Sequence, residues 1–315
     1  MIEDFKIRLR YLEAPDIANQ VFLLVLSLIG LFLLPPIEKL IVLLINLLLG
    51  IVIVYAVSIY EKKDEFAKRK PGAARMFRFF YPILMVAFCF KQIYFLMVYA
   101  SPVLYDSYLI KIDRAIFGTD PTMISMHFNH PLFTEFIQII YSIFYLMPII
   151  FACELYLWHR YEELKYAMFV IFVGFYLSFL GYLILPAIGP RFTIHDFSSI
   201  DTELPGLFFA KLLRHFIDFG ESIPAGVPNP EQFAQRDAFP SGHTIMIVLI
   251  AYLSRKIRSN SFYFYLPYAI LMIFSTVYLR YHYVADLIGA VPFILVTIYI
   301  ANRVYKNKNI NFRSI

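Results

Sequence analysis

The chain has 315 residues, of which 60% are hydrophobic and 16% are charged, and its formal net charge is +5. Soluble domains hold about a quarter charged residues, so this composition excludes a soluble globular domain and a disordered chain. With two cysteines a disulfide scaffold is also excluded, and the sequence predicts an all-α, polytopic integral membrane helical bundle.

Runs of about 20 mostly apolar residues mark candidate transmembrane helices, because that length crosses the hydrocarbon core of a bilayer. The sequence holds about eight such runs, and the sixth of them is short. In chain order they are residues 17–34, 40–60, 79–100, 132–158, 166–185, 240–253, 262–278 and 283–304.

The connections between these runs divide into a basic set and a less basic set. The N-terminus, the segments 61–78, 159–165 and 254–261 and the C-terminal tail hold more than twice as many Lys and Arg residues as the connections opposite. By the positive-inside rule both termini are expected in the cytoplasm, which an even number of spans satisfies. The external loop 186–239 is then expected to face the periplasm, a lumen or the exterior.

The predicted organisation has three parts. Residues 1–78 hold two transmembrane helices and a basic cytoplasmic loop, residues 79–306 form a catalytic membrane core of six helices, and residues 307–315 are a basic cytoplasmic tail. No internal repeat or soluble domain is visible.

Two segments on the non-cytoplasmic side have amphipathic character. Segment 101–131 mixes apolar and charged residues, and residues 206–219 place apolar residues at roughly helical spacing. Each is expected to form either an interfacial helix or an ordered loop. Asp106 and Asp113 are expected to cap or solvate the first segment.

Three short polar stretches fall at the same predicted membrane face. They are Gly189-Pro190-Arg191-Phe192, Phe239-Pro240-Ser241-Gly242-His243-Thr244, and Leu279-Arg280-Tyr281-His282-Tyr283-Val284-Ala285-Asp286. They follow the fifth run, open the sixth and open the eighth. Ionisable groups are costly within a membrane, so this convergence predicts an active site at that face.

His282 and Asp286 are four residues apart, a spacing that places both on one face of a helix. A carboxylate there can accept a hydrogen bond from one ring nitrogen, which fixes the tautomer and leaves the other nitrogen as a nucleophile or base. A simple helix-stabilising pair is the alternative. The cost of ionisable groups at a membrane-embedded helix end favours the functional interpretation.

The second stretch and two arginines can hold a phosphate. Ser241 is a candidate N-cap, and the free N–H groups and dipole of a helix N-terminus bind anions. Gly242 lets an anion approach the backbone, and His243 stands beside it as a proton donor. Arg191 and Arg280 add cations, with interfacial snorkelling as the alternative. This set suits phosphoryl transfer with no metal and no cofactor.

Phe239-Pro240-Ser241-Gly242-His243, followed by His282, three residues and Asp286, resembles the type 2 phosphatidic acid phosphatase superfamily. These proteins are integral-membrane lipid phosphatases and phosphotransferases. The resemblance extends from the third apolar run onward, and its specific motifs lie within residues 186–289.

The resemblance also implies a role for each site residue. His282 would be the nucleophile that forms a phosphohistidine, Asp286 would orient it, and His243 would protonate the leaving group and then help to activate the acceptor. The residues implied to hold the phosphate oxygens are Ser241, Gly242, Arg191 and Arg280.

Two positions depart from the family pattern. The usual first motif is a Lys, six residues and Arg-Pro, but Ile184 stands seven residues before Arg191. Lys91 is a candidate replacement, with a snorkelling or paired Lys as the alternative. The usual third motif has an Arg six residues before its His, where this chain has Thr276, and Arg280 is the candidate replacement.

Two enzyme functions stay open on this pattern. The sequence from His282 to Asp286 and the eight-span plan resemble the inositol phosphorylceramide synthase-like branch, which transfers a phospho-head group from a phospholipid to a lipid alcohol. Gly242 is similar instead to the phosphatase branch. A lipid transporter or flippase is a remote alternative, because the polar residues gather at one interface. The expected partners are a membrane lipid substrate and the bilayer, with no nucleic acid.

Several other polar residues have two interpretations each. Glu154, in the fourth run, is expected at the cytoplasmic interface, although intramembrane carboxylates are functional candidates. His195 and Asp196 either line the mouth of the site or lie on a loop surface. Arg236 and Asp237 either pair with each other or contact substrate.

Overall fold

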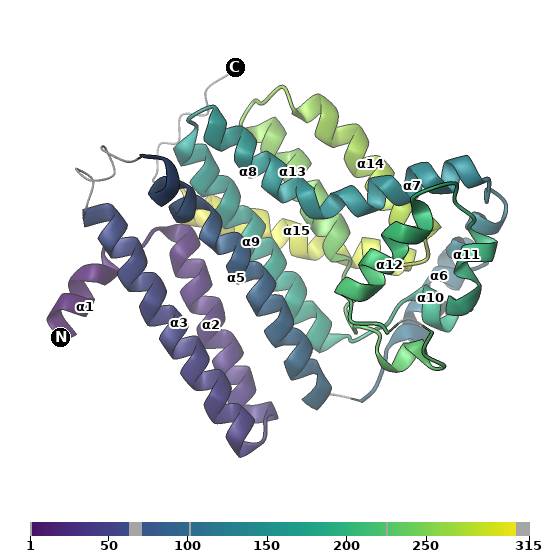
Figure 1. The fold of residues 1–315 in the computed structure, drawn as a ribbon, viewed down its shortest axis with the longest axis horizontal. Coiled ribbons are helices and arrows are strands. Elements are labelled where there is room, and N and C mark those ends of the chain that lie inside the picture. Colours follow the sequence, from purple (N-terminus) through teal and green to yellow (C-terminus); the bar gives the residue numbers. More distant parts are fainter. Residues whose placement is uncertain (1, 63–70, 101, 225, 307–315) are drawn as a thin grey trace.

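The computed structural model describes residues 2–62, 71–100, 102–224 and 226–306, and within them every regular element is a helix (Figure 1). Part of the predicted basic loop 61–78 and all of the predicted tail 307–315 lie outside the described residues. The α-helices are α1 (Ile2–Leu9), α2 (Ala14–Leu33), α3 (Pro36–Lys62), α5 (Pro71–Tyr99), α6 (Asp106–Phe117), α7 (Pro131–Ile143), α8 (Met147–Leu157), α9 (Tyr161–Ile184), α10 (Pro190–Thr193), α11 (Ile200–Glu203), α12 (Ala210–Gly220), α13 (Gly242–Lys256), α14 (Phe262–Tyr278) and α15 (Val284–Val304). The 3₁₀ helices are η1 (Pro121–Met126), η2 (Phe144–Leu146), η3 (Phe197–Ser199) and η4 (Pro230–Gln232).

Six helical segments of the described chain are long and apolar enough to cross a membrane, which fits an integral membrane protein. They are Ala14–Leu33, Pro36–Tyr60, Phe77–Tyr99, Pro131–Leu157, Tyr161–Ile184 and Val284–Val304. The other two predicted runs also form helices, α13 and α14, but these are shorter, with 15 and 17 residues.

The fourth predicted run does not form one continuous helix. It divides into α7, the 3₁₀ turn η2 and α8. Pro148 lies in the first turn of α8 and has no N–H to donate to the carbonyl of Phe144, so one α-helical hydrogen bond is lost at this point. The interruption occurs where Phe144 lies against His243, with ring centroids 4.5 Å apart.

Helix α9 lies at the centre of the bundle, where it packs against α2, α5, α8, α13 and α15 (Figure 1). It is the most buried of the six candidate spans. The N-terminal pair α2 and α3 pack side by side, and α2 also contacts α5 and α9. The two N-terminal spans therefore lie against the rest of the bundle mainly through α2, while Asn46 of α3 hydrogen-bonds to Gln92 of α5.

Long-range contacts join the basic connections at one end of the bundle. Lys165 Nζ lies 2.8 Å from Glu13 Oε1, and an Arg160 Nη atom donates to the carbonyl of Ile257 at 2.6 Å. The polar stretches meet one another elsewhere, as described below. The structure thus groups the segments as the sequence predicts, while the side of the membrane that each group faces stays a prediction from the loop charges.

Candidate active site

His282 is held so that one ring nitrogen is fixed and the other faces His243. Its Nδ1 lies 2.9 Å from the carbonyl oxygen of Ala238 and 3.2 Å from Oδ2 of Asp286. Both of these atoms are acceptors when Asp286 is ionised, so Nδ1 carries the hydrogen. Nε2 then carries a lone pair, and it lies 3.1 Å from Nδ1 of His243.

Asp286 holds this pair together at the start of α15. Its Oδ2 also accepts the N–H of Tyr283 at 2.9 Å, and its own backbone carbonyl accepts the N–H of Ser241 at 3.2 Å. The sequence predicted that His282 and Asp286 share a helix face, and this is wrong in detail. His282 precedes the helix, whose N-cap is Tyr283, and the two side chains meet across the helix N-terminus.

His243 lies in the first turn of α13. The predicted N-cap is confirmed, because Ser241 Oγ accepts the N–H of Thr244 at 3.2 Å. The imidazole is flanked by aromatic rings, including Tyr141 at 4.9 Å between centroids. Its Nε2 is buried and has no hydrogen-bond partner within the described part of the chain.

Two glycines permit close approach of the surrounding segments. A Cβ at Gly242 would collide with the hydroxyl of Tyr182 on α9. Gly189 has φ +91°, a left-handed conformation, and a Cβ there would lie 2.7 Å from the carbonyl oxygen of Tyr281. Glycine is therefore required at both positions for sterical reasons, independent of any ligand.

Arg191, on the short helix α10, is brought next to the histidines. Its backbone N–H donates to the carbonyl of Arg280 at 3.0 Å. Its buried guanidinium lies 4.5 Å from the ring centroid of Tyr281 and forms ion pairs with Asp218, at 3.1 Å, and with Glu221. Both carboxylates come from the end of α12, and no sequence pattern indicates this pairing.

Arg280 is not brought to the same place, which departs from the predicted phosphate-binding role. Its φ of +67° turns the chain between α14 and His282, and its guanidinium binds Ser125 Oγ at 3.2 Å and the carboxylate of Glu203. It does not line the cavity described next. Arg280 is two residues from His282, but in an irregular segment this spacing does not determine the direction of a side chain. It therefore could not predict that the guanidinium of Arg280 binds Ser125 and Glu203.

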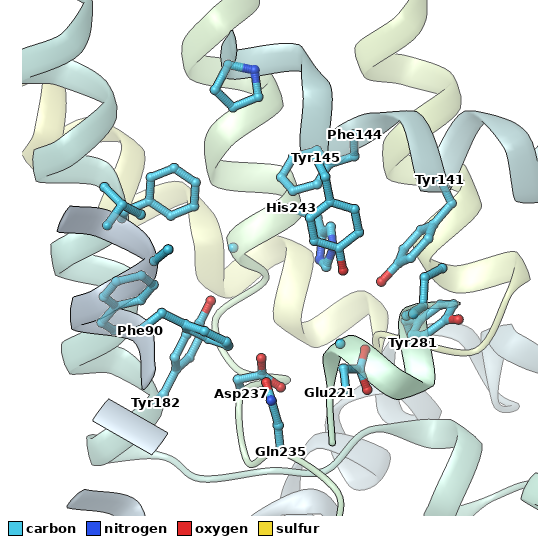
Figure 2. Close-up of a pocket in the computed structure, with 18 of the residues that line it drawn as sticks. Phe90, Tyr141, Phe144, Tyr145, Tyr182, Glu221, Gln235, Asp237, His243 and Tyr281 are labelled. Carbon is cyan, nitrogen blue, oxygen red and sulfur yellow. The ribbon is translucent and has the colours of Figure 1, made fainter. Parts of the chain in front are cut away.

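A cavity of about 510 Å³ lies beside the histidines (Figure 2). One part of its wall is apolar and comes from α5, α8 and α9, with Val86, Phe90, Ile149, Phe172 and Phe175 among its residues. The polar residues that line it are Arg191, Glu221, Gln235, Asp237, His243 and His282. Gly242 also lines the cavity, whereas Ser241 and Asp286 lie behind it.

Burial sets the protonation of two groups at the cavity. It lowers the pKa of His282 to about 4, against the opposing effects of the Asp237 charge and the hydrogen bond to Ala238. His282 is therefore neutral near pH 7 and keeps its lone pair. Burial also raises the pKa of Glu221 to about 7, with the Arg191 charge lowering it by less.

Asp106 and Asp113 on α6 do not have the predicted surface role. Asp106 accepts the N–H groups of Ile188 and Gly189, at 3.1 and 2.9 Å. Asp113 accepts the first two N–H groups of α15, those of Val284 and Ala285, at 2.9 and 2.8 Å. Both are buried. Their spacing of seven residues puts them on one face of α6, and this was the available sequence signal.

The remaining candidates are distributed around the molecule. Lys91 Nζ donates to the carbonyl of Gly220 at 3.3 Å, next to Glu221 at the cavity. Glu154 binds the hydroxyls of Ser259 and Ser261 in the connection before α14. His195 contacts Thr122 at 2.9 Å. Asp196 caps η3. Asp237 lines the cavity, and the other three residues of this group do not: His195, Asp196 and Arg236.

The comparisons with known proteins agree with this geometry. A family model described as the PAP2 superfamily matches residues 107–300, which is more than half of the chain and contains Arg191, His243, His282 and Asp286. The chain belongs to the PAP2 superfamily.

A PA-phosphatase related-family protein of Dictyostelium discoideum is 32% identical to this chain over 119 residues, which are 38% of the chain. The aligned segment spans 20% of that relative's length. No solved structure matches the chain.

Proposed function

We propose that this PAP2 superfamily protein transfers the phosphoryl group of a membrane lipid phosphate through a phosphohistidine at His282. The observation that carries the proposal is the orientation of its ring. Nδ1 is fixed by Ala238 and Asp286, and Nε2 is neutral and within 3.1 Å of a second histidine at the cavity. An oriented imidazole whose Nε2 carries a lone pair becomes an activated nucleophile once a substrate displaces the contact with His243.

In the first step, Nε2 of His282 would attack phosphorus while the bond from phosphorus to the lipid oxygen breaks. His243 in its protonated form would give the Nε2 hydrogen to that oxygen, so that a neutral lipid alcohol leaves. His243 lines the cavity, and its Nε2 has no hydrogen-bond partner within the described residues, which supports this assignment. The incoming phosphorus would replace Nδ1 of His243 as the neighbour of His282.

In the second step, an acceptor hydroxyl would lose its proton to His243 as its oxygen bonds to phosphorus. The phosphorus–nitrogen bond breaks, and its electron pair returns to His282. With water as the acceptor the product is a phosphate, and with an alcohol it is a new phosphoester. The charge on the transferring group would be held by Arg191 and the N–H groups at the start of α13.

The apolar part of the cavity, between α5, α8 and α9, would receive part of the lipid tail, with the phosphate beside the histidines. On the topology predicted from the loop charges, the head group would lie at the non-cytoplasmic interface. Because arginine and backbone groups supply the positive charge in this scheme, we expect a chelator to leave turnover unchanged.

The test is to trap the intermediate. Purified protein given a lipid substrate labelled at phosphorus should acquire label that is stable to base and lost in acid, as expected for a phosphohistidine. His282→Ala should acquire none, and Asp286→Asn should acquire label more slowly. Full turnover by the His282→Ala variant would refute the mechanism.

Transfer to a lipid alcohol, as in inositol phosphorylceramide synthase-like enzymes, is the second candidate. Three polar side chains support it, because they line the same cavity as His282 and can hydrogen-bond to hydroxyl groups of a polar substrate: Glu221, Gln235 and Asp237. An assay of phosphatidylinositol with and without ceramide separates the two candidates. Free phosphate or a soluble phosphoester indicates hydrolysis, and a new phospholipid indicates transfer.

A further inference from the structure

The cavity is lined by more carboxyl groups than basic side chains. Arg191 is the one Lys or Arg side chain among the described residues that line it. Glu221 and Asp237 line it as well, and Figure 2 shows both carboxylates at the same end of the cavity as Gln235, facing the space next to His243. This is an unexpected charge balance for a pocket that receives an anion.

Arg191 is also already engaged. One Nη atom pairs with Asp218 at 3.1 Å, the other pairs with Glu221, and the faces of the guanidinium lie near the rings of Phe192 and Tyr281 at 4.7 and 4.5 Å. A substrate phosphate must therefore share this cation with Glu221 or displace it. The charge of the substrate decides how costly that sharing is, because each added negative charge is repelled by the same carboxylates.

A phosphate monoester carries up to two negative charges near neutral pH, because its second pKa is about 6, whereas a phosphodiester carries one. We propose that this site selects a lipid phosphodiester over a lipid phosphate monoester, and that Glu221 is the residue that sets this preference. The inference rests on the histidine mechanism proposed above, because it concerns the substrate of the same histidine pair. It favours the second candidate function, since the phospholipid donor of a head-group transfer is a diester and a lipid phosphate is a monoester.

The polar wall of the cavity offers a place for the second substituent of a diester. Gln235 is buried, and its Nε2 has no hydrogen-bond partner within the described residues. An unpaired buried donor costs stability, so a ligand oxygen at this position would be stabilised. The diester phosphorus would then lie between an apolar wall for its lipid substituent and a polar wall for its other substituent.

The test uses two lipids that differ by one methyl group and one charge: dioleoyl phosphatidic acid and its methyl diester, dioleoyl phosphatidylmethanol. Purified protein in detergent micelles is assayed with each above pH 7, and release of diacylglycerol is measured. The wild type should have the higher kcat/KM with the diester. Glu221→Gln should shift the ratio of the two kcat/KM values toward the monoester by about tenfold or more.

The control is Glu231→Gln, which changes an exposed carboxylate outside the cavity and should leave the ratio unchanged. A wild type that prefers the monoester, or a ratio that Glu221→Gln does not move, overturns the inference. If Glu221→Gln does not fold, Asp218→Asn should move the ratio in the same direction, because Asp218 pairs with the same guanidinium.

A failure of the proposed function gives a different result. In that case neither lipid yields diacylglycerol, or the His282→Ala variant yields as much as the wild type. Binding of the two lipids to the His282→Ala protein in nanodiscs still decides the inference, because the charge preference needs no turnover. Tighter binding of phosphatidylmethanol supports it, and tighter binding of phosphatidic acid overturns it.

Discussion

Nδ1 of His243 lies 3.1 Å from Nε2 of His282, so the two imidazoles are in direct hydrogen-bond contact. Because Nδ1 of His282 faces two acceptors, the shared hydrogen belongs to His243 in the neutral pair. The lone pair of His282 is therefore engaged by His243 in this structure. A substrate must displace that contact before the proposed attack.

Replacing His243 by Ala is expected to slow turnover of a lipid phosphate by about a hundredfold to ten-thousandfold, the usual loss when a general acid is removed. A substrate with a nitrophenol leaving group should lose much less, because its oxygen leaves without a proton. The comparison of kcat for the two substrates checks this. Equal losses would contradict the role of His243 as the acid.

The two arginines are expected to respond differently to substitution by Lys. Arg191→Lys should raise KM about tenfold, because a single ammonium cannot replace the planar guanidinium at the phosphate. Arg280→Lys should leave KM nearly unchanged and lower the free energy of unfolding by about 1–3 kcal/mol, because Arg280 is buried against Ser125 and Glu203. Substrate titrations and thermal unfolding in detergent separate the two effects.

Asp113→Ala is expected to disturb the site from a distance. The change leaves the N–H groups of Val284 and Ala285 without their acceptor, at a cost of about 1–3 kcal/mol, and loosens the start of α15 that carries Asp286. Both Tm and kcat should fall. Lys111→Gln, on the exposed side of α6, is the matched control and should change neither.

Turnover of a diester should depend on pH through Glu221, whose pKa is raised to about 7 by burial. As the pH rises from about 6 to about 8, Glu221 ionises and competes with the substrate for Arg191, so KM should rise. His282, with its pKa near 4, stays neutral over this range. The ionisable groups around Glu221 are Arg191, Asp218, Asp237, Tyr141, Tyr145 and Tyr281.

The measurement is KM for phosphatidylmethanol across this pH range, since a diester keeps a single charge throughout. The rise should be absent in Glu221→Gln. A rise of the same size in that variant would assign the titration to another group.

The local motifs predicted the positions of residues at helix starts more accurately than the side-chain contacts between distant segments. Residues adjacent to a recognisable helix start, such as Ser241 and His243, were placed correctly because a cap and its first turn are local structures. Arg280 was predicted to hold the phosphate, but its guanidinium lies against Ser125 and Glu203, because side-chain direction in an irregular connection depends on the groups packed around it. The pairing of Arg191 with Glu221 joins segments that no local rule connects.

The sequence by itself determined the membrane-bundle class, most of the spans and the residues of the candidate chemistry. It could do so because apolar run length, helix capping and motif spacing are properties of neighbouring residues. The tertiary structure alone decided which cation reaches the cavity, which carboxylates surround it, and that α6 braces α15 through Asp113. These contacts join residues that are far apart in the sequence. They form only when the helices pack together, so no local pattern of residues predicts them.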